Sequence, residues 1–184
     1  MLEWFQEIDK GLFLLFNGLG SPYLDGFMIF MSNKYVWIPL YLVLIYRLYQ
    51  VHGLKLYLPL LALLLVILCT DQTTSTFMKP YFARLRPCKD PDLMGLMTII
   101  DDCRGKFGFA SGHAANSFGV ASFFYLKEKS KPMIALMVWA GVVSYSRVYL
   151  GVHYPGDIIA GGLIGFSFAY LWLKLYQKIT LKAY

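Results

Sequence analysis

Residues 54–69, with the sequence LKLYLPLLALLLVILC, are the stretch that decides the fold. Lys55 is its only charged residue, and the segment continues through residues 70–78 without a glycine or proline. A run of this length and apolarity is long enough for a helix that crosses a lipid bilayer. The run turns polar at residues 71–74, so the sequence predicts a spanning helix over 54–78 with a polar end.

The composition of the whole chain indicates several such helices. Of the 184 residues, 58% are hydrophobic and only 15% are charged, and the mean hydropathy is +0.53. A soluble domain carries roughly 25% charged residues. The length suits one domain. We therefore predict an all-α, polytopic membrane bundle of about six helices, with residues 1–184 forming a single domain.

Further helices are predicted on both sides of the 54–78 segment. Residues 22–49 are long enough to span, with a polar interruption at 32–34, and three more helices are expected near 112–126, 132–149 and 156–178. Residues 2–16 gather apolar side chains on one face, which is typical of a helix lying in the membrane interface. This arrangement has five spans, whereas a crossing by residues 3–20 would make six.

Basic residues gather in short turns and in the tail, at 47–55, 127–131 and 174–182. The positive-inside rule places these segments in the cytoplasm. The order of the helices then puts the 79–110 loop and the 147–156 turn together on the opposite, outer face. The formal charge of +6 follows from this topology, so no nucleic-acid partner is expected.

Polar groups at fixed offsets stand at the outer ends of these apolar segments. In chain order they are Lys79, Arg86, Ser111, Gly112, His113, Arg147, His153 and Asp157. Three cations, two imidazoles and one carboxylate suit a site that binds a phosphate, attacks it with an imidazole and protonates its leaving group.

Each group also has a simpler interpretation. A basic side chain such as Lys79 or Arg84 can reach from a helix end to the membrane surface. Ser111 can serve only as the cap of a helix, and His153 with Asp157 can form a structural hydrogen bond. The chain contains three groups of these residues, at 79–86, 111–113 and 147–157. Their occurrence in this order, on one predicted face, favours the phosphate site.

The order and spacing of these groups resemble the type 2 phosphatidic acid phosphatase (PAP2) family, which shares its site with vanadium haloperoxidases. The resemblance covers the chain from Lys79 to Asp157, with one departure: Ala110 stands where the family pattern has proline before Ser-Gly-His. It implies that His153 is a nucleophile that forms a phosphohistidine, that Asp157 orients it, and that His113 is the general acid. The phosphate ligands that it implies are Lys79, Arg86, Ser111, Gly112 and Arg147.

The resemblance implies an integral membrane lipid phosphatase that needs no metal or cofactor. Its location would be a bacterial cytoplasmic (inner) membrane, crossed several times, with the active site facing the periplasm or the outside. The small size resembles undecaprenyl-diphosphate phosphatases, so we expect conversion of undecaprenyl diphosphate to undecaprenyl phosphate. Alternatives are a phosphatidylglycerophosphate, phosphatidic acid or lipid A phosphatase and, more remotely, a vanadium haloperoxidase or a non-catalytic lipid-binding protein. The expected partners are the lipid phosphate and the bilayer; the oligomeric state stays open.

Two cysteines, Cys88 and Cys103, fall in the predicted outer loop, whereas Cys69 falls in a membrane helix. Because the outer face of a bacterial cytoplasmic membrane is oxidising, we expect the two loop cysteines to pair. Two free thiols in an exposed loop are the alternative.

Overall fold

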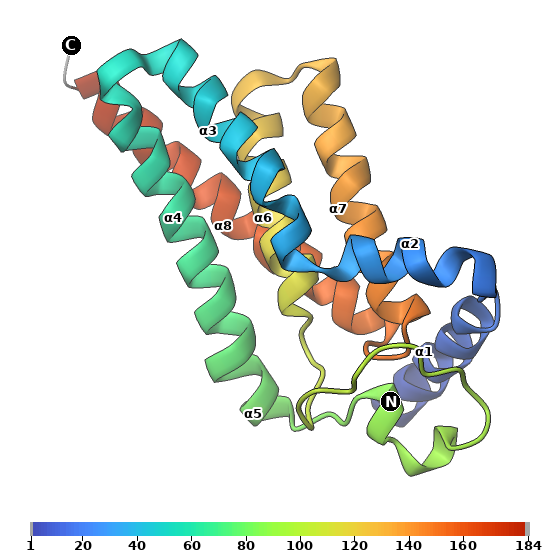
Figure 1. Cartoon of the computed structure of the whole chain (residues 1–184). Coiled ribbons are helices and arrows are strands. Elements are labelled where there is room, and N and C mark those ends of the chain that lie inside the picture. The colour runs from blue at the N-terminus through green and yellow to red at the C-terminus, as the bar shows by residue number, and fades with distance from the viewer. Residues whose placement is uncertain (1, 183–184) are drawn as a thin grey trace.

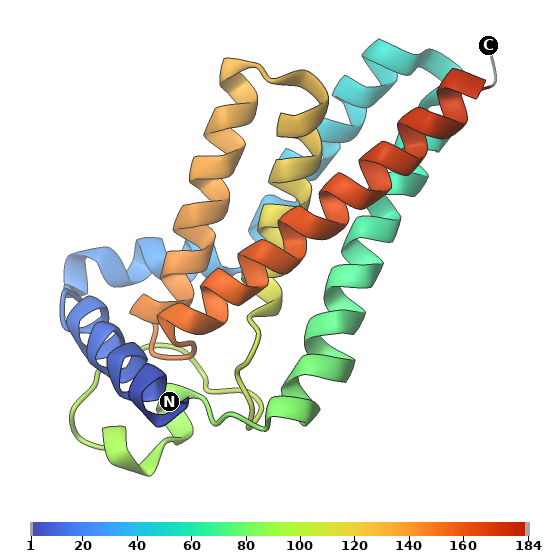
Figure 2. The ribbon, with the colours of Figure 1, turned by 180° about the vertical axis from the view of Figure 1, so that it is seen from behind.

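The computed structural model describes residues 2–182 as a bundle of helices joined by short turns and one long loop (Figures 1 and 2). Its α-helices are α1 (Leu2–Asn17), α2 (Pro22–Ser32), α3 (Ile38–His52), α4 (Tyr57–Gln72), α5 (Lys79–Phe82), α6 (Gly112–Glu128), α7 (Lys131–Tyr149) and α8 (Pro155–Lys182). Shorter turns of helix are η1 (Lys34–Trp37), η2 (Gly53–Leu56), η3 (Thr73–Met78), η4 (Pro87–Lys89) and η5 (Pro91–Leu93). The predicted all-α class is confirmed.

Helix α6 is the centre of the bundle. α8 packs along its length, and α4 and α7 flank it, as both views show (Figures 1 and 2). The main core lies among these helices and includes Val66, Phe123, Phe124, Ala140 and Ala169, all fully buried. Between membrane helices, such packing supplies much of the association because lipid chains are as apolar as the side chains.

Glycines allow α6 and α8 to approach closely. A Cβ atom on Gly161 would lie 2.5 Å from the carbonyl oxygen of Ser111, and one on Gly165 would collide with the carbonyl oxygen of Ala115. The four-residue spacing of these glycines puts them on one face of α8. The close approach brings the first turn of α6 against α8, one turn after Asp157.

The segment 22–49 differs from the prediction of one spanning helix. α2 ends at Ser32, and Asn33 takes an extended conformation in which its side chain accepts a hydrogen bond from the backbone N–H of Tyr35. After this break the chain turns, so α2 lies nearly across the direction of α3 (Figure 1). The polar interruption at 32–34 is therefore a corner, which places Ser32 near the motif residues.

Two helical stretches are long and apolar enough to cross a membrane, Lys34–Phe82 and Pro155–Leu181. The first of them turns back at η2, so α3 and α4 run in opposite directions (Figures 1 and 2). The helices Trp4–Asn17 and Pro22–Ser32, which meet at 117°, count as a third candidate if they are taken as one span. Five or six spans, and an interfacial position for α1, stay predictions.

The basic turns and the motif residues lie at opposite ends of the bundle. The turns after α3 and α6 and the end of α8 gather at one end (Figures 1 and 2). The loop between α5 and α6 and the turn between α7 and α8 lie at the other end, beside α1. The structure thus brings the three motif groups to one end, as the sequence predicts.

The glycine contact between α6 and α8 can be tested with Gly165→Ala. Because the added methyl group meets backbone, the helices must separate, and we expect the free energy of unfolding to fall by about 1–3 kcal/mol. Gly141→Ala in α7 is the matched control, since its Cβ would meet nothing within 4 Å. Alanine there should be neutral or stabilising by up to about 1 kcal/mol. Equal melting temperatures for the two variants in detergent would contradict the contact.

Candidate active site

The turn between α7 and α8 holds His153 in place through the backbone of Arg147. The carbonyl oxygen of Arg147 accepts hydrogen bonds from the N–H groups of Val152 and His153, at 3.1 and 3.2 Å. Gly151, with φ of +82°, makes the reversal possible, and a side chain there would meet the carbonyl oxygen of Thr98. Hydrogen bonds between backbone groups are therefore sufficient to close this turn.

His153 and Asp157 form a buried pair across the start of α8. Nδ1 of His153 lies 3.1 Å from Oδ2 of Asp157, and Asp157 is 0% exposed. The same carboxylate oxygen accepts the backbone N–H of Tyr154 at 3.1 Å. An ionised carboxylate can only accept hydrogen bonds, so Nδ1 of His153 carries the ring proton and Nε2 keeps a free lone pair.

Nε2 of His153 faces Arg86, whose Nη1 lies 3.4 Å away. Burial lowers the pKa of His153 to about 4, although Asp157 acts in the opposite direction. The ring is therefore neutral near pH 7, which is the state an imidazole nucleophile requires.

Arg86 is fixed by backbone carbonyls on two segments. Its Nε donates to the oxygen of Phe107 at 3.2 Å and its Nη1 to the oxygen of Val152 at 3.3 Å. Burial lowers the pKa of Arg86, with Asp157 opposing this effect. A guanidinium stays charged in proteins, so Arg86 presents a positioned cation beside the free nitrogen of His153.

Arg147 is almost fully buried, and its Nε has no hydrogen-bond partner among residues 2–182. Its Nη1 donates to the hydroxyl of Ser32 and lies 3.3 Å from Oδ2 of Asp101. Its Nε and the hydroxyl of Ser111 are buried without a hydrogen-bond partner among residues 2–182. Buried polar groups normally have a partner. A phosphate oxygen at this place could satisfy both.

Ser111, Gly112 and His113 form the beginning of α6. The N–H of Ser111 donates to the backbone oxygen of Asp157 at 3.0 Å, which joins this segment to the His153 turn. The free N–H groups of a first helical turn attract anions. His113 is the second residue of α6 and therefore stands in this first turn, directly after Gly112.

Lys79 begins α5, directly after the π-helical turn η3. Arg86, Arg147 and Asp157 all lie close enough to act on its charge. The contacts above join Arg86, Ser111, His153 and Asp157 directly and bring Arg147 to the same turn. Gly112 and His113 stand in the first turn of α6, and Lys79 stands at the start of α5 at the same end of the bundle.

Further residues belong to this arrangement without any sequence motif: Asp9, Ser32, Asp101 and Gly108. Gly108 is the most tightly placed, because its Cβ would lie 2.8 Å from Oδ2 of Asp157 and 3.5 Å from Nδ1 of His153. Arg84 offered a weak signal, since it precedes Arg86 by two residues and both side chains of an extended segment then share one face. Its Nη1 lies 3.0 Å from Oδ1 of Asp157.

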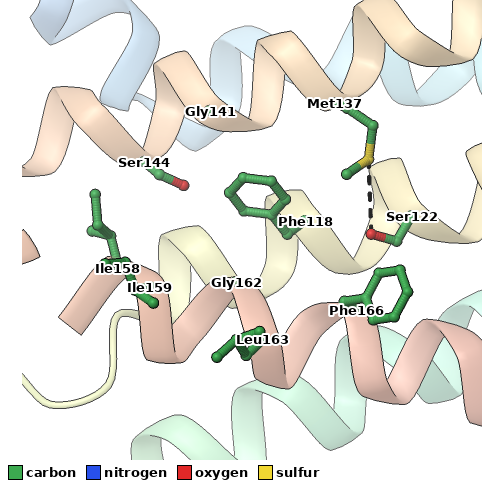
Figure 3. A pocket seen from close by; sticks show the side chains of 10 residues that line it. All are labelled: Phe118, Ser122, Met137, Gly141, Ser144, Ile158, Ile159, Gly162, Leu163 and Phe166. Carbon is green, nitrogen blue, oxygen red and sulfur yellow. Dashed lines mark hydrogen bonds between the residues drawn. The ribbon is translucent and has the colours of Figure 1, made fainter. Parts of the chain in front are cut away.

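An apolar cavity of about 390 Å³ lies between α6, α7 and α8. Phe118 stands at its base, and Met137, Leu163 and Phe166 form part of its walls (Figure 3). None of the predicted site residues lines it. Within residues 2–182, no group of three or more His, Cys, Asp or Glu side chains is placed to hold a metal ion.

The loop beside the site contains a disulfide between Cys88 and Cys103, whose Cα atoms are 6.2 Å apart. This separation lies within the usual range for disulfides. Cys69 is a free thiol in α4. The geometry is compatible with the pairing proposed from the sequence, and the bridge closes the loop that leads from Arg86 toward Ser111.

Comparison with known proteins identifies the family. A model of the PAP2 superfamily matches residues 60–181. The lipid A 4'-phosphatase of Bacteroides thetaiotaomicron is 40% identical over 184 residues, covering 98% of this chain and 82% of that protein. The undecaprenyl-diphosphatase of Sulfolobus acidocaldarius is 30% identical over 168 residues, covering 89% of this chain and 76% of that protein.

A solved structure agrees with these relatives. The crystal structure of Aquifex aeolicus LpxE superposes with a TM-score of 0.68 at 27% identity, covering 89% of this chain and 93% of that chain. The protein belongs to the PAP2 superfamily, and the resemblance seen in the sequence is confirmed. It is an enzyme of the phosphatase class that acts on lipid phosphates.

The contact of Gly108 with the His153–Asp157 pair predicts the effect of Gly108→Ala. The added methyl group must displace the carboxylate or the imidazole, and displacements of about 1 Å can lower turnover by about a hundredfold. We expect kcat to fall by about tenfold to a hundredfold. Gly11→Ala is the control, because its Cβ meets nothing within 4 Å. A folded Gly108→Ala enzyme with unchanged kcat would show that the contact is unimportant.

The disulfide predicts a simple labelling result. Alkylation of the denatured protein without reductant should modify Cys69 alone, and reduction should make all three cysteines reactive. Because the bridge closes a loop of 15 residues, reduction should lower the free energy of unfolding by roughly 3 kcal/mol. The control variant Cys69→Ser should lose the same amount on reduction. Three labelled cysteines in protein that was never reduced would exclude the bridge.

Proposed function

We propose that this protein removes a phosphate group from lipid A through a phosphohistidine on His153. The observation that carries the mechanism is the buried His153–Asp157 pair, with the free Nε2 of His153 facing Arg86 at 3.4 Å. The observation that carries the substrate is the 40% identity to a lipid A 4'-phosphatase over nearly the whole chain.

The substrate proposal corrects the expectation drawn from the sequence. The expectation of undecaprenyl diphosphate rests on the shortness of the chain, and chain length reports little about a head group. The relative named undecaprenyl-diphosphatase is 30% identical, against 40% for the lipid A 4'-phosphatase. We therefore place the 4'-phosphate of lipid A first and undecaprenyl diphosphate second.

The first half of the proposed reaction transfers the phosphoryl group to the enzyme. Nε2 of His153 attacks phosphorus in line with the lipid oxygen, the P–O bond breaks, and His113 gives its proton to the departing oxygen. Lys79, Arg86 and Arg147 balance the charge that develops on the phosphate oxygens, and the start of α6 adds N–H donors.

The second half restores the enzyme. His113, now neutral, takes a proton from a water molecule, and the water oxygen attacks phosphorus as the P–N bond to His153 breaks. The products are inorganic phosphate and free His153. Asp157 remains ionised and holds the Nδ1 proton of His153 throughout, so it orients the ring and stabilises its positive charge.

We further propose that the site faces the periplasm or the outside of a bacterial cytoplasmic membrane. The support is the separation of the basic turns from the motif residues, which lie at opposite ends of the bundle (Figure 1). A lipid phosphate at the membrane surface would then reach His153 without its apolar part leaving the bilayer.

A substrate panel tests this function. Purified enzyme in detergent should release phosphate from lipid A with a higher kcat/KM than from undecaprenyl diphosphate, phosphatidylglycerophosphate or phosphatidic acid. The activity should persist in EDTA, since Lys79, Arg86 and Arg147 supply the positive charge. His153→Asn should lower turnover by at least about a hundredfold.

Each part of the panel can fail separately. Preference for undecaprenyl diphosphate would overturn the substrate and keep the mechanism. Activity that disappears in EDTA and returns with Mg²⁺, or a folded His153→Asn enzyme with near wild-type turnover, would overturn the mechanism. Equal melting temperatures of wild type and variant establish that His153→Asn is folded.

A further inference from the structure

The N-terminal helix contributes a carboxylate to the back of the site. Oδ2 of Asp9 lies 2.7 Å from Nη1 of Arg84, and the same Nη1 lies 3.0 Å from Oδ1 of Asp157. Oδ1 of Asp9 accepts the backbone N–H of Gly156 at 2.8 Å. Asp9 thus contacts both the cation that binds Asp157 and the residue directly before Asp157.

This cluster is shielded from water. The side chains of Asp9 and Arg84 are 13% and 18% exposed, and that of Asp157 is 0% exposed. Charges in such surroundings interact more strongly than on the surface, and one left without its partner is destabilising. The guanidinium of Arg84 also stacks on the ring of Tyr154, with Cζ 3.9 Å from the ring centroid.

We propose that Asp9 is a positioning residue: it holds Arg84 against Asp157 and so keeps the Asp157 carboxylate within hydrogen-bonding distance of Nδ1 of His153. This inference rests on the proposed function, because it assigns a partner to the His153–Asp157 pair. The N-terminal helix α1 is then part of the catalytic arrangement, and its role extends beyond a place at the membrane surface.

The contact with Asp9 restricts where Arg84 can lie. Two carboxylates hold the same atom of Arg84, Nη1, one from α1 and one from the start of α8. Without the charge of Asp9, Arg84 keeps Asp157 and the ring of Tyr154, so its guanidinium is held less firmly against the Asp157 carboxylate.

The same helix offers a control that removes other ion pairs of α1 without touching Arg84. Lys10 forms ion pairs with Asp90 at 3.2 Å and with Asp92 at 2.5 Å, both in the loop after α5. Lys10→Gln removes these contacts and leaves the Asp9–Arg84 pair intact. A role of α1 that is only structural would be reduced by Lys10→Gln as much as by Asp9→Asn.

Steady-state kinetics on lipid A, or on the best substrate of the panel, give the first test. Asp9→Asn should lower kcat by about tenfold, the lower end of the range for residues that orient a reacting group, with KM changed less than about twofold. Lys10→Gln should keep kcat within about twofold of wild type. In the variant with both Asp9→Asn and Arg84→Gln, the loss of kcat should equal that of Arg84→Gln alone, because Asp9 acts only through Arg84.

The pH dependence of kcat/KM gives a second test, whose sign separates two explanations. The acid limb reports protonation of His153, which interacts with Asp157, Arg86 and Arg147, while Arg84 acts on it through Asp157. Loss of the Arg84 cation moves this limb to higher pH. If Asp9 holds Arg84 in place, Asp9→Asn must also move the limb to higher pH. A carboxylate acting only by its charge would, when removed, move it to lower pH.

The outcomes distinguish this inference from the function on which it rests. Inactive His153→Asn together with wild-type kcat and acid limb in Asp9→Asn overturns the role of Asp9 alone. Active, folded His153→Asn overturns the proposed function first. If Asp9→Asn does not purify as a folded protein, Asp9→Ser replaces it with the same readouts, since its hydroxyl can still accept the N–H of Gly156. Multiplicative losses in the double variant, or a limb that moves to lower pH, contradict the inference with either substitution.

Discussion

The rest of the structure depends on a carboxylate with no access to water, that of Asp157. An ionised carboxylate in such a place is stable only when its oxygens accept hydrogen bonds from well-placed donors. His153, Arg84 and the N–H of Tyr154 supply these donors, and the backbone oxygen of Asp157 accepts the N–H of Ser111. One residue therefore ties together the turn after α7, the loop after α5 and the beginning of α6.

This constraint explains why small residues surround the site. Gly108 leaves room for the carboxylate, Gly151 allows the reversal before His153, and Gly161 lets α8 approach the first turn of α6. None of these glycines contributes a chemical group. Each permits a close approach that a methyl group would prevent. The geometry of the reacting groups therefore depends partly on positions that have no side chain.

The sequence predicts well which residues meet at one end of the bundle. It predicts less well the path that the chain takes around them. Lys79, Arg86, His113, Arg147 and His153 could be grouped because fixed offsets place them at the same ends of apolar segments. The segment 22–49 was misjudged because apolarity alone does not separate a spanning helix from two helices with a corner at Asn33. Asp9, Ser32 and Asp101 belong to no motif, since their partners lie far along the chain. Arg147 is 46 residues from Asp101 and 115 from Ser32, and the partner of Asp9 is Arg84, in the loop after α5.

The head group of the substrate is a second point that the motif residues do not determine. Residues that hold a phosphate are common to every lipid phosphate, so motifs made of them do not distinguish one lipid from another. Similarity along the whole chain carries that information better, because it includes the loop and the N-terminal helix beside the site. The contact of Asp9 with Arg84 shows that this helix lies within one ion pair of the catalytic turn.

The central claim is that phosphate passes through His153, and rapid quenching tests it most directly. Enzyme mixed with lipid A carrying ³²P in the cleaved group should hold label during turnover, and mass spectrometry should locate it on the peptide that contains His153. His153→Asn should carry no label. Turnover by the wild type with no labelled protein, or with label on another residue, would contradict the account.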